Sequence, residues 1–546
     1  MLCNALLYTP LKQNVIKRMF PKIANKYTTV SVGWLFLAIF LLGLTIRVIF
    51  PELRMLHIDE ALHAWISYEL WMNGTYMYDP KFHGPFLYYL MATAFSLFGD
   101  TDAIVRIIPS IAGALLIPTV YALYKLEYLS KNKALIAGLF IAISPHLVYF
   151  SRFLRHDIFQ LLFIFLCIIC IYAYLERERW YFLLVSGIFA AFALTLKEEV
   201  PVTLFIIISF FCIMWVLGKI KLPKTWMRDG AITLLAIIAI IFTFYTSFFS
   251  HPEVFFNAAQ MGLTYWLGVH EECRLCGPPY WYLIMLFLYE LPILVLGITS
   301  AYIWLVQKKG IKRIKHTISM YLNEVKNKKF HLPYKPLEKQ ELFFVLCLYW
   351  LIGSLVLYGF VNEKVPWLLI HQLLPLIFIA TYAWSEWKTQ IAKIAAAISI
   401  LYLIIMMMHV AFIPIAEPIV QVQFSEQLRK VMLHIDPANN VAIVTDHYWP
   451  FPWYYRDIQN SNIKFYGSWL PPEEIDKRGF DLVIAHNSNS YSQLDGFTKE
   501  IYQRSYWFSW DKTKDRLLAW CFLRDGEVGY DGYEVFRNNL PQNHTG

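Results

Sequence analysis

Long apolar runs recur through this chain and constrain its fold more than any other feature. Only 16% of the residues are charged, against about 25% in soluble domains, which excludes an ordinary soluble fold. A helix needs about 20 apolar residues to cross a bilayer, and on that basis we predict about eleven spanning helices. They are expected at 31–50, 103–124, 134–150, 158–175, 180–196, 200–218, 231–249, 280–305, 342–361, 366–384 and 391–413.

One further apolar segment, 85–98, is too short to cross the bilayer. We interpret it as an interfacial or re-entrant helix that stays on one side of the membrane. Lys and Arg then gather in alternate connections, most densely in the segment 307–340. This is the bias that cytoplasmic loops show. The net charge of +8 therefore reflects membrane topology and requires no nucleic acid. The basic segment 1–27 is predicted to be cytoplasmic.

The composition changes after Pro414, where the chain becomes polar and aromatic. Strand-like runs appear at 441–446 (VAIVTD), 462–467 (NIKFYG) and 481–485 (DLVIA), and a helix is expected over 472–478. About 130 residues are enough for one independent core. We therefore expect a transmembrane domain over 28–415, in which the outer loop 51–102 is expected to be catalytic, followed by a small extracytoplasmic α/β domain over 416–546.

Charged side chains and histidines gather at the predicted outer ends of the spans. Ionisable residues at membrane depth are costly, so they usually have a function. The alternative for each one is a local ion pair or an interfacial anchor. The candidates are Asp59, Glu60, His63 and His83 in the first outer loop, Arg152, Arg155 and Asp157 in the second, Lys197 and Glu198 in the third, and Lys364 and His371 in the fifth.

The adjacent acids Asp59 and Glu60 are the strongest candidates for chemistry. A helix that begins near Glu60 would place Asp59 at its N-terminus, where the helix dipole favours the ionised carboxylate. Such a carboxylate can act as a general base, although an N-cap alone would explain one acid. Glu60 and His63 would share one face of this amphipathic helix. Asp59 and His63 could together hold a divalent metal ion, but nothing in the spacing requires one.

The cations predicted on the same face suit a phosphate group. Arg152, Arg155, Lys197 and Lys364 could hold a phosphate that gains charge as a bond to it breaks. The phosphate of a lipid carrier would lie at this depth. A base beside a phosphate site suggests transfer of a group from a lipid phosphate to a hydroxyl or an amide.

Cys273 and Cys276 form a CxxC motif in the predicted fourth outer loop. A structural zinc site needs a second pair of ligands, and the nearby sequence offers none. A local disulfide or two free thiols are the remaining interpretations.

These motifs resemble the GT-C membrane glycosyltransferases. The acidic pair, KFHGPFLYYL (81–90), SRFLRHDIF (151–159) and ALTLKEE (193–199) resemble the branch of the protein O-mannosyltransferases and the aminoarabinose transferases. WLGVHEECRLCGPPYWYL (266–283) and NEKVPWLLIHQLLPL (362–376) resemble an archaeal membrane protein family associated with flippase activity for lipid-linked sugars. The resemblance covers about 30–415.

The resemblance implies an inverting glycosyltransferase that uses a polyprenyl-phosphate-linked or dolichyl-phosphate-linked sugar. The acceptor would be a lipid-linked glycan or a protein. Asp59 would be the base or the carboxylate that orients the acceptor, with Glu60 beside it. The donor phosphate and sugar would contact His83, Arg152, Arg155, Asp157, Lys197, Glu198, Lys364 and His371. The family's His-Pro-Pro pattern is His83-Gly84-Pro85 here, which leaves the acceptor class open.

Two other functions remain as alternatives. A non-catalytic partner in the translocation of lipid-linked saccharides would bind the same lipid phosphate without transferring its sugar. A secondary transporter fits less well, because transporters place charges near the bilayer midplane and contain repeated halves. Here the charges are predicted at the outer ends of the spans, and the sequence shows no repeat.

Overall fold

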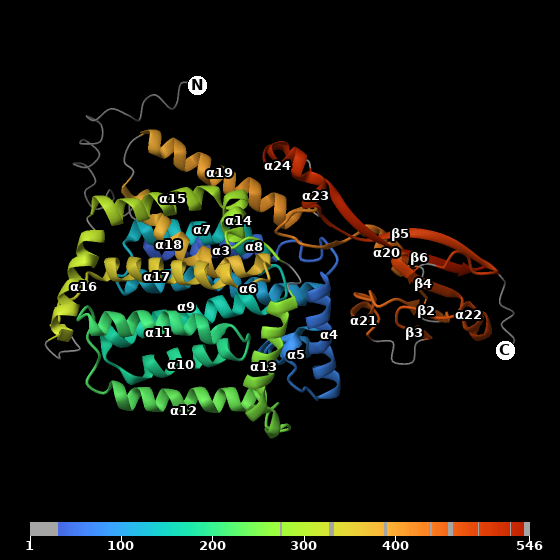
Figure 1. The fold of residues 1–546 in the computed structure, drawn as a ribbon, viewed down its shortest axis with the longest axis horizontal. Helices are drawn as coiled ribbons and strands as arrows, with labels where there is room; N and C mark the ends of the chain where they lie inside the picture. Colours follow the sequence, from blue (N-terminus) through green and yellow to red (C-terminus); the bar gives the residue numbers. More distant parts are fainter. Residues whose placement is uncertain are drawn as a thin grey trace, which may run out of the picture.

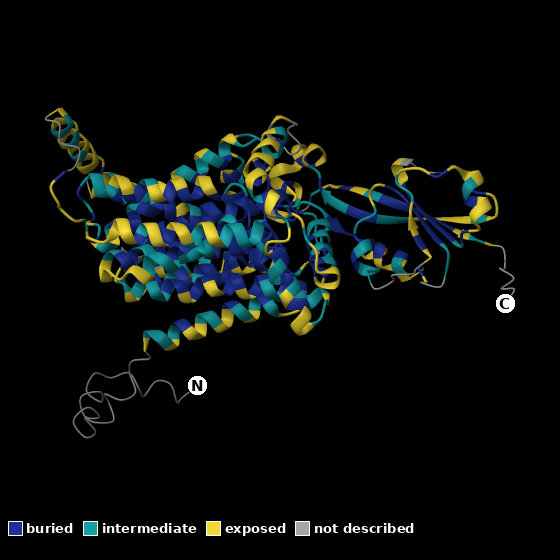
Figure 2. Cartoon of the chain, turned by 90° about the horizontal axis from the view of Figure 1, so that it is seen from below, coloured by how far each residue is buried: buried dark blue, intermediate teal, exposed yellow. Residues whose placement is uncertain are grey.

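The computed structural model describes residues 31–272, 276–308, 310–326, 332–386, 390–413, 415–433, 435–436, 439–456, 462–489, 491–524 and 526–539. These residues form a helical bundle with a sheet-containing domain at one end (Figure 1). We call that end of the bundle the domain-bearing end. Buried residues fill the centre of the bundle, and exposed residues lie along its outside (Figure 2).

The bundle is built from long apolar helices. They are α3 (Val32–Val48), α6 (Asp102–Lys125), α7 (Lys131–Ile143), α8 (Pro145–Ser151), α9 (His156–Arg177), α10 (Trp180–Leu194), α11 (Val200–Val216), α12 (Trp226–Tyr245), α14 (Trp281–Tyr289), α15 (Leu291–Tyr302), η2 (Ile303–Gln307), α17 (Lys339–Phe360), η3 (Pro366–Leu369), α18 (Ile370–Glu386) and α19 (Gln390–Phe412).

The chain is a multi-pass membrane protein. Among the described residues, 6 helices are long and apolar enough to cross a bilayer, or up to 8 if each of two bent pairs is one span. The predicted spans at 31–50, 180–196 and 200–218 correspond to the shorter apolar helices α3, α10 and α11. The count of eleven therefore remains a prediction.

Proline explains both bent pairs. α7 and α8 meet at 56°, and α14 meets the α15–η2 segment at 115°. Pro145 and Pro292 stand in the first turn of α8 and α15. Proline disfavours helical backbone in the residue before it and donates no amide hydrogen bond, so each helix ends there and another begins.

Three further helices lie at the domain-bearing end: α4 (Ile58–Asn73), α5 (Phe86–Phe98) and α13 (Pro252–Glu272). α4 and α13 run across the end of the bundle (Figure 1). α5 is the helix predicted at 85–98, and it packs against α4 and α6. The face shared by Glu60, His63 and Ser67 is buried, so the polar side of α4 faces the protein interior and not the membrane surface.

The C-terminal part contains a six-stranded sheet. Its strands are β1 (Gln423–Phe424), β2 (Val441–Val444), β3 (Ile463–Phe465), β4 (Leu482–His486), β5 (Phe497–Phe508) and β6 (Val528–Asn538), in the order β1-β5-β6-β4-β2-β3. β2 pairs in parallel with β3 and β4, and the other pairs are antiparallel. Short helices connect the strands: α20 (Glu426–Leu433), α21 (Phe451–Tyr454), α22 (Pro472–Arg478), η4 (Asn487–Asn489), α23 (Trp510–Thr513), η5 (Lys514–Arg516) and α24 (Leu517–Leu523).

The elements expected from the sequence of this part are confirmed. The runs at 441–446, 462–467 and 481–485 form β2, β3 and β4, and the helix expected over 472–478 is α22. Every residue of β2 and β4 is buried, as expected for strands that are covered on both faces.

Polar contacts fix this domain to the bundle. Asp102, the first residue of α6, accepts hydrogen bonds from Trp453 Nε1 and Tyr454 Oη, both at 2.7 Å. Arg456 Nε contacts the Asp100 carboxylate at 2.6 Å. The Leu56 amide donates to Tyr454 Oη at 3.2 Å, so α21 also contacts the segment that leads into α4.

Substitution of Asp102 tests this attachment. The side chain of Asp102→Asn has a single oxygen, so only one of Trp453 and Tyr454 can still donate to it. The other donor then faces the amide nitrogen. We expect a loss of about 1–3 kcal/mol in the docking of the C-terminal domain, measured as faster amide exchange in α21 of the purified protein. Asp476→Asn, on an exposed position of α22, is the matched control. Unchanged exchange in α21 would contradict the docking role of Asp102.

Candidate active site

The site begins at the N-terminus of α4. His57 caps the helix, and its Nδ1 accepts the Asp59 amide at 3.1 Å, while the Glu60 carboxylate accepts the His57 amide at 2.9 Å. This reciprocal arrangement is a capping box and fixes the first helical turn. Asp59 therefore has a defined position where the helix dipole favours its ionised form.

Glu60 forms a buried ion pair with Arg106 of α6. Its two carboxylate oxygens accept from Arg106 Nε at 2.9 Å and Nη2 at 2.7 Å, and the side chains are 1% and 2% exposed. The Leu154 amide donates to the same carboxylate at 3.3 Å. Burial opposes ionisation of Glu60, but the charge and hydrogen bonds of Arg106 outweigh it and lower the Glu60 pKa. These contacts give Glu60 a structural role in positioning α4.

Asp59 contacts a different partner. Its carboxylate pairs with Arg155, the residue before α9, and Arg155 Nε also contacts Asp157 at 3.4 Å. The Arg155 guanidinium lies 3.7 Å from the centre of the Trp367 ring. Asp59 is 27% exposed, whereas Asp157 is 2% exposed. Of the two carboxylates that hold Arg155, Asp59 is the one within reach of a bound molecule.

Lys197 extends this arrangement. Its ammonium lies 2.9 Å from both Asp157 and Glu199. Burial lowers the Lys197 pKa, but these two carboxylates outweigh it, so the pKa is raised and the side chain stays charged. Asp59, Arg155, Asp157, Lys197 and Glu199 alternate in sign, and we call this group the ion-pair network.

His83 and Glu198 form a second polar group. His83 Nδ1 lies 2.9 Å from Glu198, whose other oxygen accepts from Tyr78 Oη at 2.9 Å. Burial opposes the charge of Glu198, but His83 outweighs this effect and the Glu198 pKa is lowered. The His83 ring stacks on Trp266 of α13 at 4.9 Å. α13 therefore covers this part of the site.

Buried histidine rings connect the two groups. The His63 ring centre lies 4.9 Å from that of His156, which lies 5.2 Å from that of His83. His63 Nδ1 also contacts Tyr88 Oη at 3.0 Å. Burial, with Arg155 nearby, lowers the His63 pKa to about 3. His63 is therefore neutral at physiological pH and adds no charge beside Asp59.

Arg152 and Lys364 make contacts of another kind. Arg152 donates to the carbonyls of Arg47, Ile49 and Phe50 at 2.7–2.9 Å, which lie at the end of α3. Lys364 Nζ donates to the carbonyls of Tyr358, Gly359 and Val361, at the end of α17. These contacts satisfy carbonyls that a helix C-terminus leaves unpaired. They fit helix capping and give no support to the expected contact with a donor phosphate.

The structure also suggests where a divalent cation would bind. Potential ligand atoms of Asp157, Glu199 and His371 lie within 4.8 Å of one another, and this is the one such group in the part of the chain that the structure describes. His371 Nε2 lies 3.8 Å from the Asp157 carboxylate, and neither ring nitrogen forms a hydrogen bond. Asp59 and His63, the pair suggested by the sequence, do not belong to it. Two carboxylates and an imidazole suit a divalent ion. The Lys197 ammonium already contacts both carboxylates and would compete with the ion for them.

The fourth and fifth outer loops meet beside this region. Cys276 is disulfide-bonded, and its backbone pairs with Glu363. A side chain at Gly277 would come within 2.9 Å of Lys364, so glycine permits this close approach. Cys273 lies outside the described residues.

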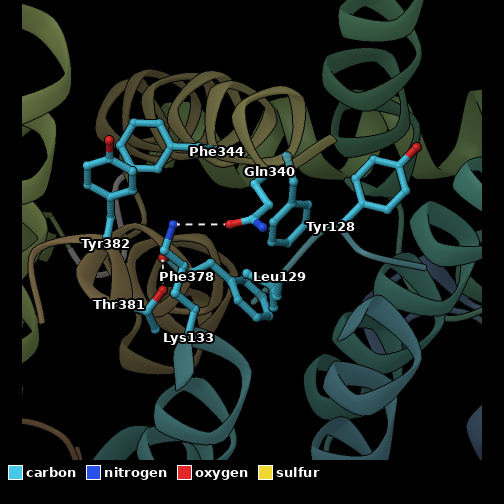
Figure 3. A pocket seen from close by; sticks show the side chains of 9 residues that line it. Tyr128, Leu129, Lys133, Gln340, Phe344, Phe378, Thr381 and Tyr382 are labelled. Atoms are coloured by element: carbon cyan, nitrogen blue, oxygen red, sulfur yellow. Dashed lines mark hydrogen bonds between the residues drawn. The ribbon is translucent and has the colours of Figure 1, made fainter. Parts of the chain in front are cut away.

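A small cavity at the opposite end of the bundle is separate from this site. It is lined by Tyr128, Leu129, Lys133, Gln340, Phe343, Phe344, Phe378, Thr381 and Tyr382 (Figure 3). These positions lie near the starts of α7 and α17 and late in α18, whereas the ion-pair network lies at the starts of α4 and α9. The cavity therefore has no contact with the candidate active site.

Several contacts were not predictable from the sequence motifs. Tyr78, Tyr88 and Trp266 are aromatic residues of outer segments, where such residues also serve as membrane anchors. Glu199 could have been identified as a site residue from the sequence, because it follows Lys197 and Glu198 in a very short connection between two apolar runs. His156 could have been identified in the same way, because it lies between Arg155 and Asp157.

The chain is similar to known proteins in part of its sequence and in its fold. The family model of the dolichyl-phosphate-mannose-protein mannosyltransferases matches residues 82–243. ArnT from Cupriavidus metallidurans is 11% identical, with a TM-score of 0.56 over 94% of this chain and 100% of that chain. The Archaeoglobus fulgidus oligosaccharyltransferase is 14% identical, with a TM-score of 0.53 over 83% of this chain and 68% of that chain.

The chain has the fold of the GT-C membrane glycosyltransferases. A search of the curated proteins gives no match. The GT-C resemblance of the sequence is thus confirmed at the level of fold. The narrower resemblance to the flippase-associated family remains a prediction.

Substitution of Glu60 tests the buried pair. Glu60→Gln leaves the Arg106 charge buried without its counter-ion, and we expect a loss of about 3–5 kcal/mol in stability. The measurement is the thermal unfolding midpoint of the purified protein in detergent. Glu69→Gln, in the same helix, is the control, because the Glu69 carboxylate accepts an exposed hydrogen bond from Asn73 and holds no buried charge. Equal midpoints for the two variants would contradict the structural role.

The same pair predicts a pH dependence. Because the folded pKa of Glu60 lies below the ordinary value of 4.5, its contribution to stability is present above pH 4.5 and is lost as the pH falls through the lower folded value. The Gln variant lacks this contribution, so the difference between its midpoint and that of the unsubstituted protein should shrink below pH 4.5. A constant difference would contradict this assignment.

Proposed function

We propose that this protein transfers a sugar from a polyprenyl-phosphate or dolichyl-phosphate carrier to an acceptor on the extracytoplasmic face of the membrane. The observation that carries the proposal is the position of Asp59, a partly exposed carboxylate that pairs with the largely buried Arg155 at one end of the ion-pair network. Glu199, at the other end of the network, is 24% exposed. The similarities support it, because the fold resembles that of the Archaeoglobus fulgidus oligosaccharyltransferase and residues 82–243 match the family model of the dolichyl-phosphate-mannose-protein mannosyltransferases.

The donor class is supported by two similar structures, one of which is the oligosaccharyltransferase AglB from Archaeoglobus fulgidus in complex with a dolichol-phosphate. ArnT from Cupriavidus metallidurans has been solved with undecaprenyl phosphate. The acceptor class is less restricted. The Archaeoglobus fulgidus oligosaccharyltransferase has been solved with a tethered acceptor peptide, and either a protein or a lipid-linked glycan fits the present proposal.

The proposed reaction is a single displacement with inversion. The acceptor oxygen or nitrogen attacks the anomeric carbon, and the bond from that carbon to the phosphate oxygen breaks. The bonding electrons leave with the polyprenyl phosphate, which gains one negative charge. Asp59 takes the acceptor proton as general base. The Arg155 charge lowers the Asp59 pKa despite burial, so the base is ionised before the reaction begins.

The leaving phosphate needs positive charge that is fixed in advance. Arg155 and Lys197 supply it, and both are held by carboxylates that prevent their movement. Three carboxylates of the network, those of Asp59, Asp157 and Glu199, face these two cations. The network can therefore accept a further positive charge. A divalent ion held by Asp157, Glu199 and His371 would supply it and would strengthen phosphate binding.

The non-catalytic role in translocation of lipid-linked saccharides would use the same phosphate contacts. It does not require a partly exposed carboxylate beside them. Loss of the sugar from a labelled donor, in the presence of acceptor, distinguishes transfer from binding alone.

Substitution of Asp59 is the central test. Asp59→Asn cannot accept the proton, and we expect transfer from a labelled lipid-linked donor to fall by about 10²–10⁴-fold, with donor binding retained. Glu52→Gln, an exposed acid in the same loop, is the matched control. An Asn variant with full transfer activity would refute the assignment of Asp59 as base.

Metal binding is tested without relying on activity. We expect the purified protein, after dialysis against Mn²⁺, to retain about one ion per chain by elemental analysis, since a single three-ligand group is proposed. His371→Ala should lower this occupancy severalfold, and His251→Ala, which removes a partly exposed histidine outside this group, should not. Equal occupancy in both variants, or no bound metal in the unsubstituted protein, would refute the site.

A further inference from the structure

The helix α16 (Gly310–Lys326) has an apolar stripe that the protein leaves uncovered. Ile311, Ile314, Ile318 and Leu322 recur at intervals of three and four residues, so they share one face. Their exposed fractions are 44%, 43%, 49% and 54%. A stripe of four large apolar side chains in water is unfavourable, so this face requires a partner.

No element in the described part of the chain covers this stripe. The main packing of α16 is against η2, directly before it in the chain, and Arg313 pairs with Glu341 at 2.6 Å. A helix of this length is marginal in water when it lacks tertiary packing. α16 lies across the end of the bundle opposite the C-terminal domain, crosswise to the spanning helices (Figure 1). Because the spanning helices must cross the bilayer, a helix in this direction lies close to the membrane plane.

The charges beside the stripe identify the partner. Lys312 and Lys315 of α16 are exposed, as is Lys308 shortly before the helix. By helical periodicity, Lys312 and Lys315 lie along one edge of the apolar face. An amphipathic helix of this kind, with lysines along its polar side, binds a membrane–water interface. A protein groove would account for the apolar stripe, but the exposed lysines beside it favour an anionic membrane surface as the partner.

We propose that α16 lies in the membrane–water interface, with its apolar stripe among the acyl chains and Lys308, Lys312 and Lys315 bound to anionic phospholipid headgroups. The helix thereby anchors the end of the bundle that is remote from the ion-pair network. Each lysine near an anionic surface contributes roughly a fivefold preference for binding, since about 1 kcal/mol per cation is typical.

The test uses the full-length protein in lipid nanodiscs. Amide exchange of residues 310–326 is compared between discs of zwitterionic phospholipid and discs that also contain phosphatidylglycerol. We expect slower exchange in the anionic discs, by about fivefold per lysine engaged, and loss of this difference at high salt. The variant K308Q/K312Q/K315Q should lose the difference, whereas K464Q/K477Q, which removes two exposed lysines of the C-terminal domain, should keep it.

A second variant examines the apolar stripe. Ile314→Ser with Ile318→Ser should raise the exchange of this segment in both kinds of disc. Exchange in α9 serves as the check that the bundle is intact. Equal exchange in detergent and in both discs would overturn the interfacial position. Slower exchange in discs that does not depend on phosphatidylglycerol would overturn the role of the anionic headgroups.

Discussion

The buried pair of Glu60 and Arg106 is the interaction on which the candidate active site depends. In a low-dielectric interior, an unpaired charge is far more costly than a paired one, so this pair permits one arrangement of α4 on α6. Arg106 also donates to the carbonyls of Pro51, Arg54 and Met55 at 2.7–3.0 Å. It thereby holds the segment that connects α3 to α4.

Both acids of the motif contact the segment before α9. Glu60 accepts the Leu154 amide, and Asp59 pairs with the side chain of the next residue, Arg155. One pair of neighbouring carboxylates thus positions the first outer segment against the second. The difference in exposure then separates their roles, because a fully buried, fully bonded Glu60 has no capacity left for a substrate, while Asp59 does.

The sequence predicted much of the fold, for reasons that are local. Apolar runs of sufficient length must leave water, and the strand-like runs of the C-terminal part are bounded by polar segments. Convergence of Asp59, Arg155, Asp157 and Lys197 was also predictable, because each stands at the same end of a predicted span. The partners of Glu60, Arg152 and Lys364 were not predictable. The sequence pattern does not distinguish whether a charged residue near a helix end forms an ion pair, caps the helix or binds a ligand.

The sequence by itself determined that this chain is a membrane-embedded helical protein with a C-terminal α/β part, because hydropathy and residue periodicity act over short distances. It also determined which end of the bundle collects charge. Only the tertiary structure decided which charges face one another. Arg106 reaches Glu60 across 46 positions, and Lys197 reaches Asp157 across 40. Such pairings depend on how the helices pack, so the division between structural and reactive carboxylates appears only in the folded chain.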